Sequence, residues 1–165
     1  MVDEDVTERA RRAFADHGSF ERTDDDRYAH VATAFDGEVT VRDAGDGRVG
    51  FDVEVRVPML DDVTADDVAP VVEDGWYETF ERRVEDLGGV TAGEHDLDPA
   101  VVERNREAVV GVEFADVNER RGVDDAAAVV DYVEGTFVQG LIPGYDYVDP
   151  AASLIDRAQG TGESP

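Results

Sequence analysis

The clearest pattern in the chain is a strict alternation of apolar and polar residues from Arg48 to Val57. The apolar positions are Val49, Phe51, Val53, Val55 and Val57. Successive strand residues point to opposite faces, so this pattern predicts a strand with one buried and one charged face. A pairing shift of one residue would expose Phe51 and the valines, and we expect the core to set this strand's register.

Two segments before this strand complete a predicted three-strand meander. Residues 29–35 and 38–42 alternate more weakly, and Asp36-Gly37 between them is typical of a type I′ hairpin turn, because glycine tolerates positive φ. The sequence Ala44-Gly45-Asp46-Gly47 predicts the second turn. Residues 19–27 hold three consecutive aspartates and are expected to form a polar loop.

Apolar residues at helical spacing predict helices over residues 3–17, from about Pro70, and from about Asp124 to Gln139, with a short helix after Pro150. The stripe of the second helix is Val72, Trp76, Phe80, Val84 and Leu87. We expect this Trp76 helix to cover the apolar face of the meander.

The remaining segments complete the predicted fold. Residues 108–114 predict another strand, and Val101-Val102 a shorter one. The sequence therefore predicts an α+β, two-layer domain over residues 1–158, with an antiparallel sheet of about four or five strands and helices mainly on one face. Residues 159–165 are expected to be a disordered C-terminal tail.

The charge balance is extreme. The chain has forty-one acidic residues and only fifteen basic ones, all of them arginine, and its net charge is -26. Coding bias would explain the missing lysine, but it does not explain the acid excess. Adaptation to concentrated salt explains both, because the Debye length at 1 M is only about 3 Å and repulsion is screened. The acids are spread along the whole chain, and clustered cations are lacking, which disfavours nucleic acid as a partner.

Composition and motifs also limit the kinds of active site that the chain can form and indicate where in the cell it is found. Without cysteine there is no disulfide or thiolate site. The N-terminus lacks the apolar core of a signal peptide, and no run approaches the roughly 20 apolar residues of a membrane span, so we expect a cytoplasmic protein that does not bind membranes. No phosphate loop, dinucleotide fingerprint or nucleophile elbow occurs. Glu94-His95-Asp96 holds one histidine and is not a metal-ligand set, so we predict no catalytic, cofactor-binding or metal residue.

Arginine and tyrosine supply the candidate contact residues. Arginine forms two-pronged contacts with carboxylates or phosphates. These side chains either bridge to the chain's own acids or form a site for an anion or an acidic partner. The candidates are Arg104, Arg106, Arg120, Arg121, Tyr145 and Tyr147.

The lysine-free composition and the segment Asn118–Tyr147 resemble a family of uncharacterised domains from halophilic archaea. The resemblance implies no activity, cofactor or catalytic residue. The order of elements is similar to that of the secretion-chaperone-like fold, whose members are small dimeric proteins that bind other proteins, although a shared fold does not establish function. We expect a non-enzymatic protein-interaction module whose partner is a second copy or another protein. A small-molecule or anion binder is the alternative, and an unrecognised enzyme is the third hypothesis.

Overall fold

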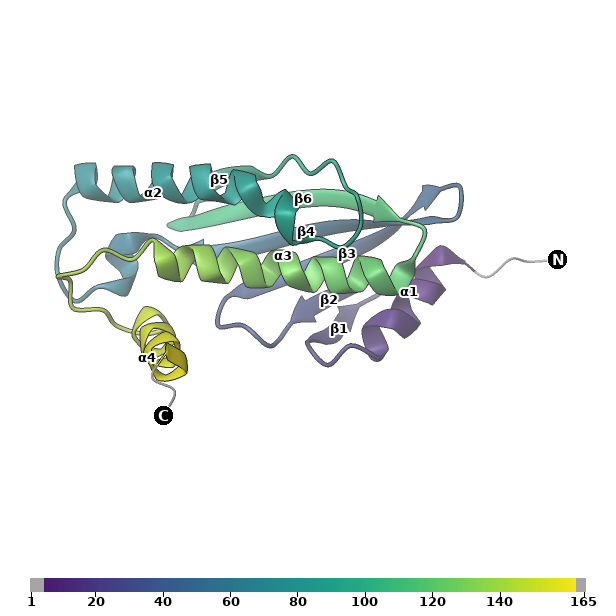
Figure 1. Ribbon diagram of the computed structural model, residues 1–165, viewed down its shortest axis with the longest axis horizontal. Coiled ribbons are helices and arrows are strands. Elements are labelled where there is room, and N and C mark those ends of the chain that lie inside the picture. Colours follow the sequence, from purple (N-terminus) through teal and green to yellow (C-terminus); the bar gives the residue numbers. More distant parts are fainter. Residues whose placement is uncertain (1–4, 163–165) are drawn as a thin grey trace.

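The computed structural model describes residues 5–162 and contains one six-stranded antiparallel sheet in the order β1-β2-β3-β4-β6-β5 (Figure 1). The helices and 3-10 helices are α1 (Val6–Ala15), η1 (Leu60–Val63), α2 (Pro70–Val84), η2 (Glu85–Val90), α3 (Glu119–Gln139) and α4 (Ala151–Gly162). The strands are β1 (Phe20–Asp24), β2 (Arg27–His30), β3 (Asp36–Gly45), β4 (Arg48–Pro58), β5 (Ala100–Arg104) and β6 (Glu107–Asp116). The predicted α+β class is confirmed.

Strand β4 buries the predicted apolar face. Phe51 lies opposite Val41 of β3 and Phe114 of β6, and Val53 lies opposite Val39 and Val112. The five apolar side chains of β4 that face the helices are between 0% and 2% exposed. Three adjacent strands therefore present one continuous apolar surface to the helix layer.

Helix α3, rather than the Trp76 helix, covers this surface. Figure 1 shows α3 running across the sheet and α2 lying along one side of it. A Cβ atom on Gly122 of α3 would lie 2.3 Å from the Phe51 ring, so the helix approaches β4 more closely than a larger residue allows. Trp76 packs edge-on against Phe137 of α3, with ring centroids 5.9 Å apart. The prediction that α2 is the main cover was wrong because small residues on α3 permit the closer contact.

The sheet has six strands instead of the predicted four or five, and it begins with a four-strand meander instead of three. Residues expected to form a polar loop make β1 and its turn, where Asp26 has a φ of 58°. Phe20 explains why this segment is ordered, since its ring packs edge-on against Phe14 at 4.9 Å. Asp36 and Gly37 begin β3 and are not the turn; Gly37 is needed there because Val130 of α3 would lie only 3.0 Å from a Cβ.

The helix boundaries also differ from the prediction. Helix α3 begins at Glu119 instead of Asp124, because the Asn118 side chain accepts a hydrogen bond from the Arg121 amide and caps it. Helix α4 includes residues 159–162 of the predicted tail, and residues 163–165 lie outside the described part, as do residues 3 and 4 of the first predicted helix. Within residues 5–162, no helix is both long and apolar enough to cross a membrane.

Candidate functional site

Helices α1, α2 and α3 lie on one side of the sheet (Figure 1). The outward residues of β3, β4 and β6 on the other side include several partly or fully exposed acids. The carboxylates on that side are direct cross-strand neighbours: Glu38 of β3 lies opposite Glu54 of β4, and Asp52 of β4 lies opposite Glu113 of β6. Like charges placed directly opposite each other destabilise a sheet. This face, which we call the acidic sheet face, therefore carries a local electrostatic cost.

The acidic sheet face is hollowed. A depression of about 560 Å³ crosses β3, β4 and β6, and Asp96 and Asp98 of the segment before β5 contribute to its wall. The lining residues are Glu38, Thr40, Asp52, Val53, Glu54, Asp96, Asp98, Ala100, Gly111, Val112 and Glu113. Six of these side chains are carboxylates, so the hollow is suited to a positively charged ligand.

The arginines of this face neutralise only part of its charge. Arg42 lies 3.5 Å from Asp52, and Arg56 and Arg104 lie 3.3 Å and 3.2 Å from Glu54. Among the described residues, no arginine is paired with Glu38 or Glu113, the outer members of the two acidic pairs.

The exposed apolar side chains do not suggest an alternative binding surface. The large ones are valines that lie on different segments of the described chain. They are Val31, Val71, Val90, Val102, Val117 and Val148. No described element therefore presents an exposed apolar stripe of the kind expected for a hydrophobic docking face.

The four predicted arginines lie in separate places, and each contacts carboxylates of its own chain. Arg104 pairs with Glu54, as described above, and Arg120 lies 2.6 Å from Asp16. Arg106 is in the β5–β6 turn, with a φ of 62°. Its guanidinium donates to both Glu73 oxygens, at 2.9 Å and 2.8 Å, and these hydrogen bonds lower the pKa of Glu73. The arrangement matches the alternative in which arginines bridge to the chain's own acids.

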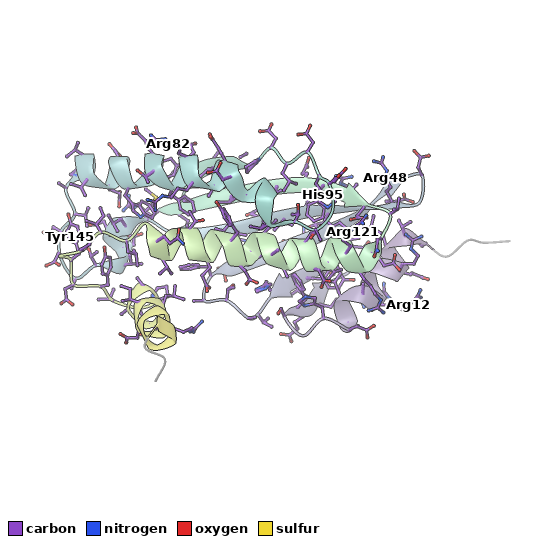
Figure 2. All side chains as sticks on the ribbon, in the orientation of Figure 1. Arg12, Arg48, Arg82, His95, Arg121 and Tyr145 are labelled. Carbon is purple, nitrogen blue, oxygen red and sulfur yellow. The ribbon has the colours of Figure 1, made fainter. Side chains whose placement is uncertain are left out.

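The two predicted tyrosines are distant from the α3 arginines. Figure 2 shows Tyr145 at one end of the molecule, with Arg121 towards the other. The Tyr147 hydroxyl donates to the Ile142 carbonyl at 2.6 Å and accepts from its amide at 2.7 Å, which closes the turn before α4. The six predicted contact residues are therefore not brought together into one site.

A second polar site is buried beside α3 and was not predicted. It consists of His95, Asp116 at the end of β6, and Asp125 of α3, which we call the His–Asp cluster. Their side chains are 5%, 2% and 3% exposed. His95 Nε2 lies 3.0 Å from Asp125 Oδ2 and 3.6 Å from Asp116 Oδ2. One donor atom from each residue lies within 4.8 Å of the others, and such a set could hold a metal ion.

Each carboxylate of the His–Asp cluster has further donors. Arg121 donates to both oxygens of Asp116 at 2.8 Å, and the Asn118 amide donates to one of them at 2.8 Å. Burial alone would raise the pKa of Asp116, but these hydrogen bonds and the Arg121 charge lower it below its ordinary value. The Ala92 and Gly93 amides hold Asp125 at 2.7 Å and 3.0 Å.

Sequence reasoning missed the His–Asp cluster because it tested His95 only with its sequence neighbours. Glu94 is exposed and Asp96 lines the hollow on the other face of the sheet. The acids that contact His95 are 21 and 30 residues further along the chain. A weak signal existed in Asp125, which occupies a position on the buried side of α3.

A comparison with family models places most of this chain in one family. The model of a family of unknown function, DUF5813, matches residues 15–157. Searches of curated proteins and of solved structures found no match. The predicted resemblance to an uncharacterised domain family is confirmed, while the halophilic origin stays a prediction. Since the match runs from the last residue of α1 through all six strands and into α4, the chain belongs to the DUF5813 family of unknown function.

Proposed function

We propose that this chain is a non-enzymatic binding module that holds a basic segment of a partner protein against its acidic sheet face. One observation carries the proposal: carboxylates lie directly opposite each other across β3, β4 and β6, on a face that α1, α2 and α3 leave uncovered. An arginine-rich or lysine-rich segment would neutralise this repulsion on binding. The module would therefore gain electrostatic free energy that the isolated domain lacks.

The shape of the hollow favours a polypeptide over a single ion. It spans three strands, and a spacing of about 4.8 Å between strands makes it about 10 Å wide. A helix or an extended chain has a similar width, whereas a bare cation would contact only one or two of the six carboxylates.

The chemistry of the lining favours binding over catalysis. The side chains are carboxylates, small apolar groups and one threonine hydroxyl, with no histidine beside a nucleophile. The protein-interaction hypothesis from the sequence is thus retained, with the acidic sheet face as the proposed contact surface. Homodimerisation is a separate proposal, and sedimentation in molar KCl that shows only monomer would contradict it.

Calorimetric titration with a ten-residue arginine-rich peptide tests the proposal. The variant Glu38→Gln/Glu113→Gln removes the outer member of each acidic pair, and Glu78→Gln/Glu81→Gln on α2 is a control with the same charge change. Each exposed carboxylate contributes about 0.2–1 kcal/mol, so we expect the sheet variant to bind about two- to thirty-fold more weakly and the α2 control to bind as the wild type does.

Two results would contradict this function. Equal weakening in both variants would show that the peptide responds to net charge alone. Peptide-induced shifts of backbone amide resonances confined to the helices, with none in β3, β4 or β6, would place the bound peptide elsewhere.

A further inference from the structure

The His–Asp cluster brings three donor atoms from separate parts of the chain to one buried point. Figure 2 shows His95 and Arg121 near each other, beside the first half of α3. We propose that His95 Nε2, Asp116 Oδ2 and Asp125 Oδ2 bind one divalent cation that accepts mixed nitrogen and oxygen ligands, such as Mn²⁺ or Zn²⁺. This site is independent of the acidic sheet face.

The distances among the three donor atoms fit a shared metal ion. Nε2 faces two carboxylate oxygens, at 3.0 Å and 3.6 Å, and all three side chains are almost fully buried. In the tautomer that carries its proton on Nδ1, the Nε2 lone pair faces these oxygens, and that contact is unfavourable in a region of low dielectric constant. A proton on Nε2 can form a good hydrogen bond with only one of the oxygens, at 3.0 Å, because 3.6 Å is too long. A metal ion can contact all three atoms.

The carboxylates are supported in the way that metal-ligating carboxylates are. Arg121 and the Asn118 amide hold Asp116, and two consecutive backbone amides hold Asp125. Hydrogen bonds of this kind fix the orientation of metal ligands. A carboxylate oxygen has two lone pairs, so it can accept a hydrogen bond and contact a cation together.

Gly93, in the loop over the cluster, lies directly against two of the donors. A Cβ on Gly93 would lie 2.5 Å from His95 Nε2 and 3.0 Å from Asp116 Oδ2, so any side chain at this position would crowd two of the three donors. A shallow surface hollow lies above, with Glu94 and Asp96 on its rim, next to His95. These exposed acids would attract cations to the entrance.

The charges of the site are compatible with a divalent ion. Two carboxylates balance the ion when His95 is neutral, and Arg121 keeps its charge with 43% of its side chain exposed to solvent.

The test is a Mn²⁺ titration of the full chain in molar KCl, followed by paramagnetic broadening of backbone amide resonances. At one equivalent we expect loss of the amide signals of Gly93, Asp116 and Asp125 before those of other acidic regions. Two neighbouring substitutions with the same charge change provide the comparison: Asp125→Asn removes a donor, and Asp124→Asn changes an exposed residue. We expect Asp125→Asn to weaken the first binding step at least about tenfold and Asp124→Asn to leave it unchanged.

Each outcome decides the proposal. Broadening spread evenly over the acidic surface, absence of a first tight step, or equal affinities of the two variants would overturn it. If circular dichroism shows that Asp125→Asn is unfolded, the wild-type spectrum decides alone: broadening centred on Gly93 supports the site, and any other distribution overturns it.

Discussion

The two faces of the sheet are built from alternate residues of the same strands, yet they follow different physical rules. On β4, Phe51 and Val53 face the helices and are at most 2% exposed, whereas Asp52 and Glu54 between them face outward and are half-buried. The packing of the covered face depends on the shapes of its side chains, since α3 reaches Phe51 only because position 122 is glycine. The energetics of the uncovered face depend on charge, since its carboxylates lie opposite one another and repel. A single alternating pattern thus encodes both a stabilising surface and a candidate binding surface.

The largest expected effect separates neighbouring residues on the two faces. Phe51→Ala should lower the free energy of unfolding by about 3–5 kcal/mol, because it removes a fully buried ring that packs against Phe14 and Phe114. Asp52→Asn should change it by less than about 1 kcal/mol, because its ion pair with Arg42 is partly solvated. Urea unfolding in molar KCl, followed by circular dichroism, gives both values. Similar losses would mean that the two faces are not energetically distinct.

A second prediction tests the close approach of α3 with two glycines of the same helix. Gly122→Ala should destabilise the protein by about 1–3 kcal/mol, because the new methyl group would overlap the Phe51 ring. Gly135→Ala should stabilise it by up to about 1 kcal/mol, since this exposed position has nothing within 4 Å of a Cβ and alanine favours helix. Thermal unfolding should therefore shift in opposite directions. Shifts of the same sign would contradict the packing described for α3.

A third prediction uses a histidine on the covered face. Burial lowers the pKa of His30 below its ordinary value of 6.5, and the partly compensating carboxylate, Asp131, is 3.8 Å away. The unfolded chain then binds a proton at a higher pH than the folded chain. The stabilising contribution is present above pH 6.5 and is lost as the pH falls below it.

The variant His30→Gln isolates this contribution. Free energies of unfolding measured at about pH 8 and pH 5.5 should fall less steeply for the variant than for the wild type, because only the wild type gains a proton at position 30 on unfolding. His17, whose charge also acts on His30, is present in both proteins. Parallel pH dependence in the two proteins would contradict the effect of burial.

The smallest expected effect tests the repulsion on the uncovered face. Glu38→Gln removes one carboxylate of the Glu38–Glu54 pair and should raise the free energy of unfolding by about 0.2–1 kcal/mol in dilute buffer. The gain should disappear at about 1 M KCl, where the Debye length is about 3 Å. Unfolding at both salt concentrations measures the difference. A gain that persists in high salt would have a cause other than charge.

Both candidate sites depend on contacts between distant segments, which the sequence pattern did not predict. The partners of the predicted arginines, such as Glu73 for Arg106, come from elements whose docking the sequence does not specify. The cross-strand pair of Glu38 and Glu54 was equally hidden, because the β3–β4 register shifts at an irregularity between Asp43 and Gly45 that the turn sequence does not show.

The sequence by itself determined the period of each long element: the alternation of β4, the stripe of α2 and the α+β class. These properties depend on contacts between residues a few positions apart, so they can be recognised from local spacing. Only the tertiary structure decided that α3 covers β4 and that His95 meets Asp116 and Asp125. Such contacts depend on the path of loops and on how closely two surfaces fit, and neither is a property of local spacing.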